Sequence, residues 1–206
     1  MTEGSAPTGA RFLELVEVMD RLRAECPWDR EQTHLSLVRY LLEETYETIE
    51  ALETGDRDHL REELGDLLLQ VVFHARIAAE QPDGFDIDDV AGGIAEKLVY
   101  RHPHVFAGLE VADADEVDRN WQRLKAAEKQ RTSPVEGIPP GLPALAWADK
   151  VAGRLETAGV DVASYVRGEG VGARLLALVL EARAAGLDPE QELRAETRRL
   201  ISGASG

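Results

Sequence analysis

The sequence predicts an all-α protein organised as a helical bundle. Apolar residues recur at spacings of three and four along most of its 206 residues, which is the period of an amphipathic helix. No stretch alternates convincingly at the period of two that indicates a half-buried strand. Turn residues, such as Gly55-Asp56 and Pro82-Asp83-Gly84, separate the periodic segments. We therefore expect helices with little or no sheet.

Five helices are expected before the proline-rich segment of the chain. Pro27 ends the first, because proline restricts the residue before it to extended conformations. Thr33 or Ser36 would cap the second, and Asp56 or Asp58 the third. The five span about Arg11–Glu25, a segment that ends at Leu52, about Leu60–Glu80, about Val90–Tyr100 behind caps at Asp86 to Asp89, and about Glu116–Gln130.

The third of these helices carries the strongest burial signal. It has no formally charged residue from Leu67 to Ala75, and it is apolar around most of its circumference. A helix that is hydrophobic on all sides is buried between other helices. We therefore expect this segment at the centre of the bundle.

Proline and glycine divide the chain into parts. Positions 133–143 are rich in both residues and read as a linker. We expect a disordered N-terminus over residues 1–10, a main helical domain over 11–132, and a small helical segment over 144–206.

The last segment resembles a shortened copy of the first domain. Leu67–Arg76 can be laid on Arg174–Arg183 without gaps, and the apolar pattern is kept. In this register Glu63 falls on Gly170 and Asp66 on Ala173, so the acids are lost. Any two buried helices would align in a similar way, so the repeat is one of two interpretations. In either case we assign residues after 143 to packing or assembly.

Charge and composition exclude several classes of function. The formal net charge of −16 is opposite to that of proteins that bind DNA or RNA, and anionic lipid would repel it. Cys26 is the one cysteine, so no intramolecular disulfide forms and a reducing compartment fits. Residues 1–10 lack the pattern of a signal peptide, and no apolar run reaches the roughly 18 residues of a membrane span. We expect a cytoplasmic protein with neither membrane nor nucleic-acid polymer as partner.

Two acidic pairs are the candidate site. Glu44 with Glu47, and Glu63 with Asp66, are spaced at i and i+3, so each pair lies on one face of its helix. Two antiparallel helices joined by a short turn would bring the four carboxylates together. Their mutual repulsion calls for a hard divalent cation, and Mg²⁺ prefers oxygen ligands. No cysteine lies nearby and no histidine follows these acids at i+3 or i+4, which argues against zinc.

An ordinary solvated face is the alternative interpretation of such acids. An ExxE pattern on a helix is usually only surface charge, and Glu43, Glu50 and Glu53 fit that description. Glu63 and Asp66 differ, because they share a face with Gln70, Phe73 and Ile77 that becomes apolar. Carboxylates at the edge of a buried face need pairing or a metal.

The ordered set of motifs resembles the MazG family of nucleotide pyrophosphohydrolases over roughly residues 11 to 130. The acids follow its EExxE…ExxD signature. The motifs that carry the resemblance are Cys26-Pro27-Trp28-Asp29-Arg30-Glu31-Gln32-Thr33, Leu42-Glu43-Glu44-Thr45-Tyr46-Glu47, Glu63-Leu64-Gly65-Asp66-Leu67-Leu68, Arg101-His102-Pro103-His104-Val105-Phe106 and Trp121-Gln122-Arg123-Leu124-Lys125.

The resemblance implies a reaction, a fold and an assembly. Members hydrolyse nucleoside triphosphates, including deoxy forms, between the α and β phosphates, which would serve to clean the nucleotide pool. The resemblance also implies a MazG-like helical bundle completed by homodimerisation. Two-domain members carry a complete second copy of the motif, whereas the acids of that copy are missing here, so we expect the first domain to be the active one.

The family also implies roles for individual residues. The metal ligands would be Glu44, Glu47, Glu63 and Asp66, with Mg²⁺ as cofactor and Mn²⁺ as a substitute. Glu44 and Glu47 are the expected catalytic carboxylates, and Glu47 is our candidate for orienting or deprotonating the attacking water. Glu43 would be auxiliary. The nucleotide contacts would be Lys97, Arg101, Trp121 and Lys125, since cations neutralise the phosphates and the indole can stack.

Three rival hypotheses remain open at this stage. The first is another all-helical pyrophosphohydrolase, acting on dUTP, dCTP or phosphoribosyl-ATP. The second is a non-catalytic helical dimer with a regulatory or assembly role. The third, a di-iron bundle, expects Glu-x-x-His pairs, and none occurs near the acids.

Overall fold

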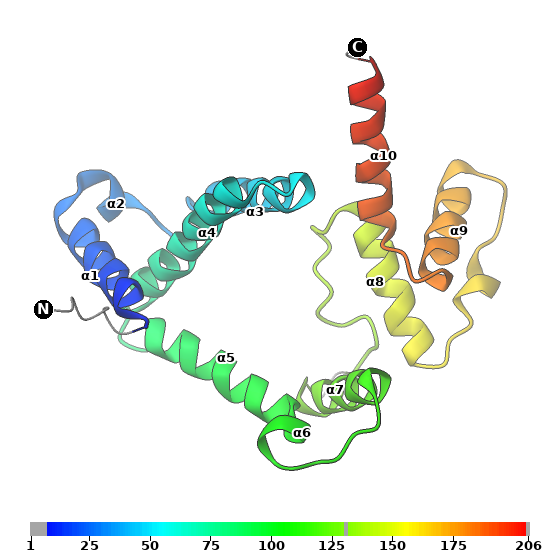
Figure 1. The fold of residues 1–206 in the computed structure, drawn as a ribbon, viewed down its shortest axis with the longest axis horizontal. Helices are drawn as coiled ribbons and strands as arrows, with labels where there is room; N and C mark the ends of the chain where they lie inside the picture. The colour runs from blue at the N-terminus through cyan, green and yellow to red at the C-terminus, as the bar shows by residue number, and fades with distance from the viewer. Residues whose placement is uncertain (1–7, 130–131, 205–206) are drawn as a thin grey trace, which may run out of the picture. The chain divides into compact units, whose positions relative to one another are not determined.

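The computed structural model describes residues 8–129 and 132–204 (Figure 1). All regular secondary structure in these residues is helical, which confirms the all-α prediction. The chain divides into two compact units, Met1–Trp121 and Gln122–Gly206. Residues 1–7, to which most of the expected disordered N-terminus belongs, lie outside the described residues; residues 8 and 9 form a turn and Ala10 begins the first helix.

The first unit holds the expected helices together with two short ones. The short helices each begin with proline, whose fixed φ suits a first helical position. The last helix, α7, crosses the boundary between the units. The helices are α1 Ala10–Glu25, α2 Pro27–Glu31, α3 Val38–Thr54, α4 Arg57–Ala78, α5 Ile87–Arg101, α6 Pro103–Phe106 and α7 Ala114–Lys129.

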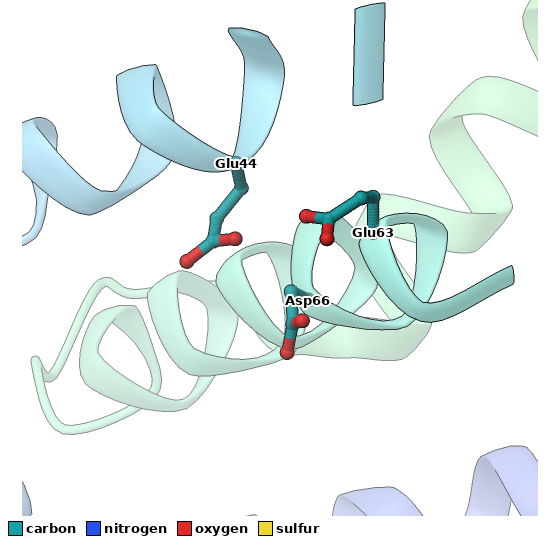
Figure 2. Close-up of side chains that lie close together, drawn as sticks. All are labelled: Glu44, Glu63 and Asp66. Atoms are coloured by element: carbon teal, nitrogen blue, oxygen red, sulfur yellow. The ribbon is translucent and has the colours of Figure 1, made fainter. Parts of the chain in front are cut away.

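Helices α3 and α4 form an antiparallel hairpin around a tight turn (Figure 1). Gly55 ends α3 with a φ of 73°, a left-handed conformation that glycine adopts without a steric penalty. Asp56, one of the two expected caps, accepts hydrogen bonds from the backbone N–H groups of Asp58 and His59 at 3.0 and 3.1 Å. The hairpin places Glu44 of α3 opposite α4 (Figure 2).

The core of the first unit forms where α1 packs on α4. Met19, Leu37, Val72, Phe73 and Ile77 are its buried members. Helix α4 is less enclosed than its composition suggests. Its outer side chains remain exposed within one chain, at 50% for Leu64, 38% for Leu68 and 40% for Val71.

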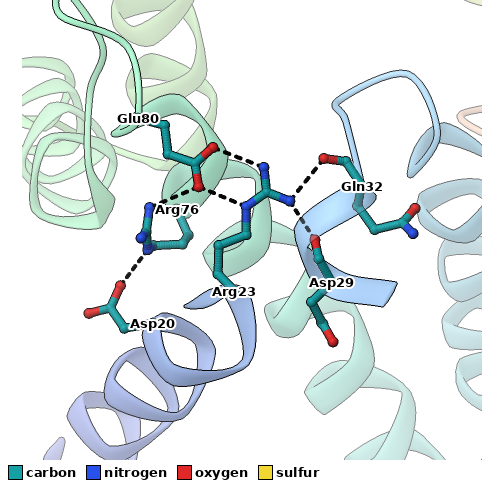
Figure 3. Close-up of polar contacts among 6 residues, drawn as sticks. All are labelled: Asp20, Arg23, Asp29, Gln32, Arg76 and Glu80. Atoms are coloured by element: carbon teal, nitrogen blue, oxygen red, sulfur yellow. Dashed lines mark hydrogen bonds and ion pairs between the residues drawn. The ribbon is translucent and has the colours of Figure 1, made fainter. Parts of the chain in front are cut away.

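A buried arginine ties three segments of the first unit together (Figure 3). Arg23 of α1 donates from Nε and Nη2 to the two carboxylate oxygens of Glu80, at 2.7 and 2.9 Å. Its Nη1 donates to the backbone carbonyls of Asp29 and, at 3.0 Å, Gln32. The Arg23 hydrogen bonds hold the pKa of Glu80 below its usual value. Arg23 therefore fixes the segment around α2 against α1 and the end of α4.

We expect Arg23→Leu to lower the free energy of unfolding by about 2–4 kcal/mol, because two carbonyls and a partly buried carboxylate lose their donor. Arg21→Leu is the matched control, since the exposed Arg21–Glu25 pair is worth roughly 0–1 kcal/mol. Urea denaturation measures both variants. Equal destabilisation by the two would contradict a structural role for the buried network.

The second unit is a smaller helical group. Arg183 of α9 donates to Glu156 at 2.7 Å and to Asp149 at 3.0 Å, both on α8. Gly153 makes room for this guanidinium, because an added Cβ would lie 2.5 Å from it. Gly170 and Ala173, the positions aligned with Glu63 and Asp66, fall at the beginning of α9. The elements are α8 Ala144–Thr157, η1 Val162–Tyr165, α9 Val171–Ala184 and α10 Pro189–Ala204.

Length and hydropathy decide which helices can cross a membrane. Within the described ranges, none is both long enough and apolar enough to cross a bilayer.

Candidate metal and nucleotide site

Three of the four predicted carboxylates meet between α3 and α4. Glu44, Glu63 and Asp66 each offer an oxygen, and these oxygens all lie within 4.8 Å of one another (Figure 2). Glu63 and Asp66 project from consecutive turns of α4, as their i, i+3 spacing requires. Glu44 faces them because the turn at Gly55 and Asp56 makes the two helices antiparallel.

Glu63 is the most buried member of this acidic cluster, at 7% exposure. Its Oε1 lies 3.1 Å from Nε2 of His59, one turn earlier on α4. Its Oε2 is buried and has no hydrogen-bond partner in the described part of the chain. An unpaired buried carboxylate oxygen is costly, so this atom calls for a cation. His59 was not among the predicted site residues, although its position four residues before Glu63 was a visible signal.

Burial and, after it, repulsion within the cluster change the pKa of Glu44. Burial raises this pKa above its ordinary value, and the charges of Asp66, Glu47 and Glu63 raise it further. Glu44 therefore resists ionisation in the absence of a cation. A divalent ion would remove this resistance, and an all-oxygen set of three carboxylates completed by waters suits Mg²⁺.

Glu47 lies at the edge of the cluster, outside the group of three. Its side chain is exposed. Partial loss of hydration raises its pKa, as do the charges of Glu63 and Glu43, whereas His59 lowers it. Glu47 is thus near enough to feel Glu63 and is open to solvent. Glu43 is also exposed on α3, and its charge raises the pKa of both Glu44 and Glu47.

The stability of the metal-free protein should reveal this repulsion. Because the pKa of Glu44 is higher in the folded state than its ordinary 4.5, ionising Glu44 destabilises the fold as the pH rises through the raised value. We expect Glu44→Gln to raise the Tm by about 1–3 °C at pH 7 in EDTA. The gain should disappear below about pH 4.5, where Glu44 is protonated in both states.

Glu50→Gln is the matched control, since it makes the same change at an exposed site on the same helix. Thermal melts from pH 4 to pH 8 measure all three proteins. A Glu44→Gln variant less stable than wild type at pH 7 would contradict the repulsion.

The predicted nucleotide contacts lie on other helices. The guanidinium carbon of Arg101, on α5, is 5.4 Å from the ring centre of Trp121, on α7. Ile87, at the beginning of α5, packs against the core beside α4. Lys97 and Arg101 lie roughly 15 and 21 Å further along α5 at a helical rise of about 1.5 Å per residue. Helix α5 leads away from α3 and α4 (Figure 1), so one chain does not bring Lys97 and Arg101 beside the acids. Lys125 belongs to the second unit.

These features define a class: an all-α protein with an acidic cluster suited to a divalent cation on a helical hairpin. Residues 32–106 match the MazG nucleotide pyrophosphohydrolase domain, a segment that contains the whole cluster. Lys97 and Arg101 also fall inside the matched segment, whereas Trp121 and Lys125 fall outside it.

Relatives agree with this match. A nucleoside triphosphate pyrophosphohydrolase/pyrophosphatase MazG from Thermotoga maritima is 38% identical over 94% of this chain and 84% of its own length. A nucleoside triphosphate pyrophosphohydrolase from Mycolicibacterium smegmatis is 51% identical over 74% of this chain and 48% of its own length. A 26.1 kDa protein from Streptomyces cacaoi is 56% identical over 91% of this chain and 78% of its own length. This chain spans about half the length of the mycobacterial relative. The chain belongs to the MazG family.

Proposed function

We propose that the protein hydrolyses nucleoside and deoxynucleoside triphosphates between the α and β phosphates, releasing a nucleoside monophosphate and pyrophosphate. Mg²⁺ is the proposed cofactor and Mn²⁺ its substitute. The observation that carries the proposal is the group of three carboxylates within 4.8 Å, one of which has a buried oxygen without a hydrogen bond in the described structure. The names of the mycobacterial and Thermotoga relatives support the same reaction.

The four carboxylates have two different proposed roles. Glu44, Glu63 and Asp66 would hold the cation, and Glu47 stands at their solvent-facing edge. A bound divalent cation neutralises charge on the phosphates and lowers the pKa of a coordinated water. Glu47 is the candidate base for the attacking water, because its raised pKa lies closer to neutral pH than that of an ordinary glutamate. The oxygen of this water bonds to the α-phosphorus. The bond between the α-phosphorus and the oxygen that bridges to the β-phosphate breaks, and this oxygen leaves as part of pyrophosphate.

A homodimer is part of the proposal. The exposed side chains of Leu64, Leu68 and Val71 form an apolar row along α4, and α5 exposes Ile94 and Leu98. Apolar surfaces of this kind mark protein interfaces. Lys97 and Arg101, which lie far along α5 from the cluster of their own chain, would reach the cluster of a second copy. Trp121 and Lys125 would complete the nucleotide contacts.

The net charge of the protein supports a class of substrate. A formal net charge of −16 disfavours nucleic-acid polymers and anionic membranes, so free nucleotides are the proposed substrates. Nucleotide-pool housecleaning in the cytoplasm is the role that we propose.

Product analysis tests the reaction. The protein is incubated with canonical and damaged nucleoside triphosphates in Mg²⁺, in Mn²⁺ and in EDTA, and pyrophosphate and phosphate are scored separately. We expect equal amounts of monophosphate and pyrophosphate with either metal and neither product in EDTA. Release of single phosphates would show that the cleavage site is wrong. No release from any substrate would favour a non-catalytic dimer.

A further inference from the structure

A polar stripe continues the acidic cluster along α4. Glu63, Asp66, Gln70 and His74 follow one another at spacings of three, four and four, so they lie on one face of the helix. Gln70 is only 5% exposed, in a stretch of α4 whose other buried residues are apolar. The reaction proposed above leaves Gln70 without a role.

Buried atoms of this stripe lack partners. Glu63 Oε2, Gln70 Oε1 and His74 Nε2 are each buried and have no hydrogen-bond partner among the residues that the structure describes. Native proteins pair most such groups, because an unpaired one retains its full desolvation penalty. A cation explains the Glu63 oxygen. It does not by itself explain the amide oxygen of Gln70, about two helical turns beyond Glu63.

The far end of the stripe is closed by other side chains. Nδ1 of His74 lies 2.8 Å from Nδ1 of His34, and the two rings are within 5° of parallel. Face-to-face rings would be about 3.5 Å apart or more, so these rings lie edge to edge and share an N–H···N hydrogen bond. Trp28 packs against Phe73 at 6.5 Å between ring centres. One end of the stripe is therefore the acidic cluster, and the other end is the pair of His74 and His34.

The chemistry of Gln70 Oε1 restricts what can satisfy it. A carbonyl oxygen only accepts hydrogen bonds, so its partner must carry an N–H or an O–H. Ionised phosphate oxygens are acceptors and do not meet this need. The nucleoside part of a triphosphate has both kinds of donor, on the base and on the sugar. It extends from the α-phosphate, and Gln70 lies about 6 Å along α4 from Asp66.

We propose that Gln70 is a substrate-binding residue, whose Oε1 accepts a hydrogen bond from an N–H or O–H of the nucleoside. This inference rests on the proposed function and assigns that site a residue that selects among nucleotides. Selection follows because a substrate without the matching donor leaves the buried oxygen unpaired.

Substrate analogues combined with Gln70→Met test this assignment. Methionine is unbranched and similar in length, and it removes the amide. Wild type and variant are compared on adenosine triphosphate, its 2′-deoxy and 3′-deoxy forms, and purine riboside triphosphate, which lacks the exocyclic amino group. Gln191→Met, an exposed change in the second unit, is the matched control. Gln70→Leu serves as a second variant if Gln70→Met fails to fold.

We expect Gln70→Met to lower kcat/KM roughly 10-fold on adenosine triphosphate, mainly through KM. One analogue should show no such penalty, because it already lacks the donor that Gln70 binds. If Gln70→Met loses no activity on purine riboside triphosphate, Gln70 binds the amino group of the base. If it loses no activity on one of the deoxy forms, Gln70 binds the sugar hydroxyl that this form lacks. An equal penalty on every substrate, or none on any, overturns the inference while the reaction stands. A wild-type protein that releases no pyrophosphate overturns the proposed function itself.

Discussion

Glu63→Gln is expected to lower kcat by about 100-fold or more while the protein remains folded. Glutamine has nearly the shape of glutamate and keeps an oxygen for the contact with His59. It removes the negative charge at the most buried ligand of the cluster, where a cation would be least hydrated. The loss should therefore appear in metal binding and in turnover together.

Steady-state kinetics with increasing Mg²⁺ measures this loss, and thermal melts measure the Mg²⁺-dependent rise in Tm. Glu62→Gln is the matched control, because Glu62 is the neighbouring residue on α4 and is exposed. We expect wild-type kinetics and a wild-type rise in Tm from the control. A Glu63→Gln enzyme with normal turnover would remove Glu63 from the metal site.

Local sequence signals predicted the helices well. The turn at Gly55 and the cap at Asp56 are set by residues within four positions of one another, so no tertiary information was needed. The capping box at Asp86 and Asp89 is equally local. The two short helices that begin at Pro27 and Pro103 were missed, because proline was interpreted only as a helix breaker.

Tertiary packing decided what the sequence left open. Neither Thr33 nor Ser36 caps α3; they bond to one another's backbone in the preceding turn, and α3 begins at Val38. The apolar circumference of α4 suggested complete burial, yet Leu68 stays partly exposed in one chain, since composition does not distinguish a core from an interface.

Some residues of the candidate site were also predictable from local sequence, and others depend on tertiary packing. The i, i+3 spacing was sufficient to place Glu63 and Asp66 on one face, and a short turn was sufficient to bring Glu44 to them. The exposure of Glu47 depends on how α3 rotates against α4, which no local pattern specifies. The approach of Lys97 to the acids of a second copy is part of the proposal, so its role stays a prediction.

Complementation between two inactive variants should restore activity if the site is shared by two copies. Glu63→Gln damages the acids of one chain, and Lys97→Ala removes a proposed phosphate contact from the other. In a heterodimer of the two, one composite site takes its acids from the Lys97→Ala chain and its lysine from the Glu63→Gln chain, so it is intact. We expect each homodimer to be weakly active and the heterodimer to reach about half of wild-type activity, since one of two equivalent sites is restored.

Heterodimers are obtained by co-expressing the variants with different tags and purifying on both. A heterodimer of Glu63→Gln with Glu44→Gln is the control, because both changes damage acids that come from a single chain, so both of its sites carry one defect. That control should stay as inactive as its parents. Failure of the Glu63→Gln and Lys97→Ala pair to exceed its parents would mean that each chain supplies its own lysine. Helix α5 would then have to move towards α3 and α4 to bring Lys97 to the acids of its own chain.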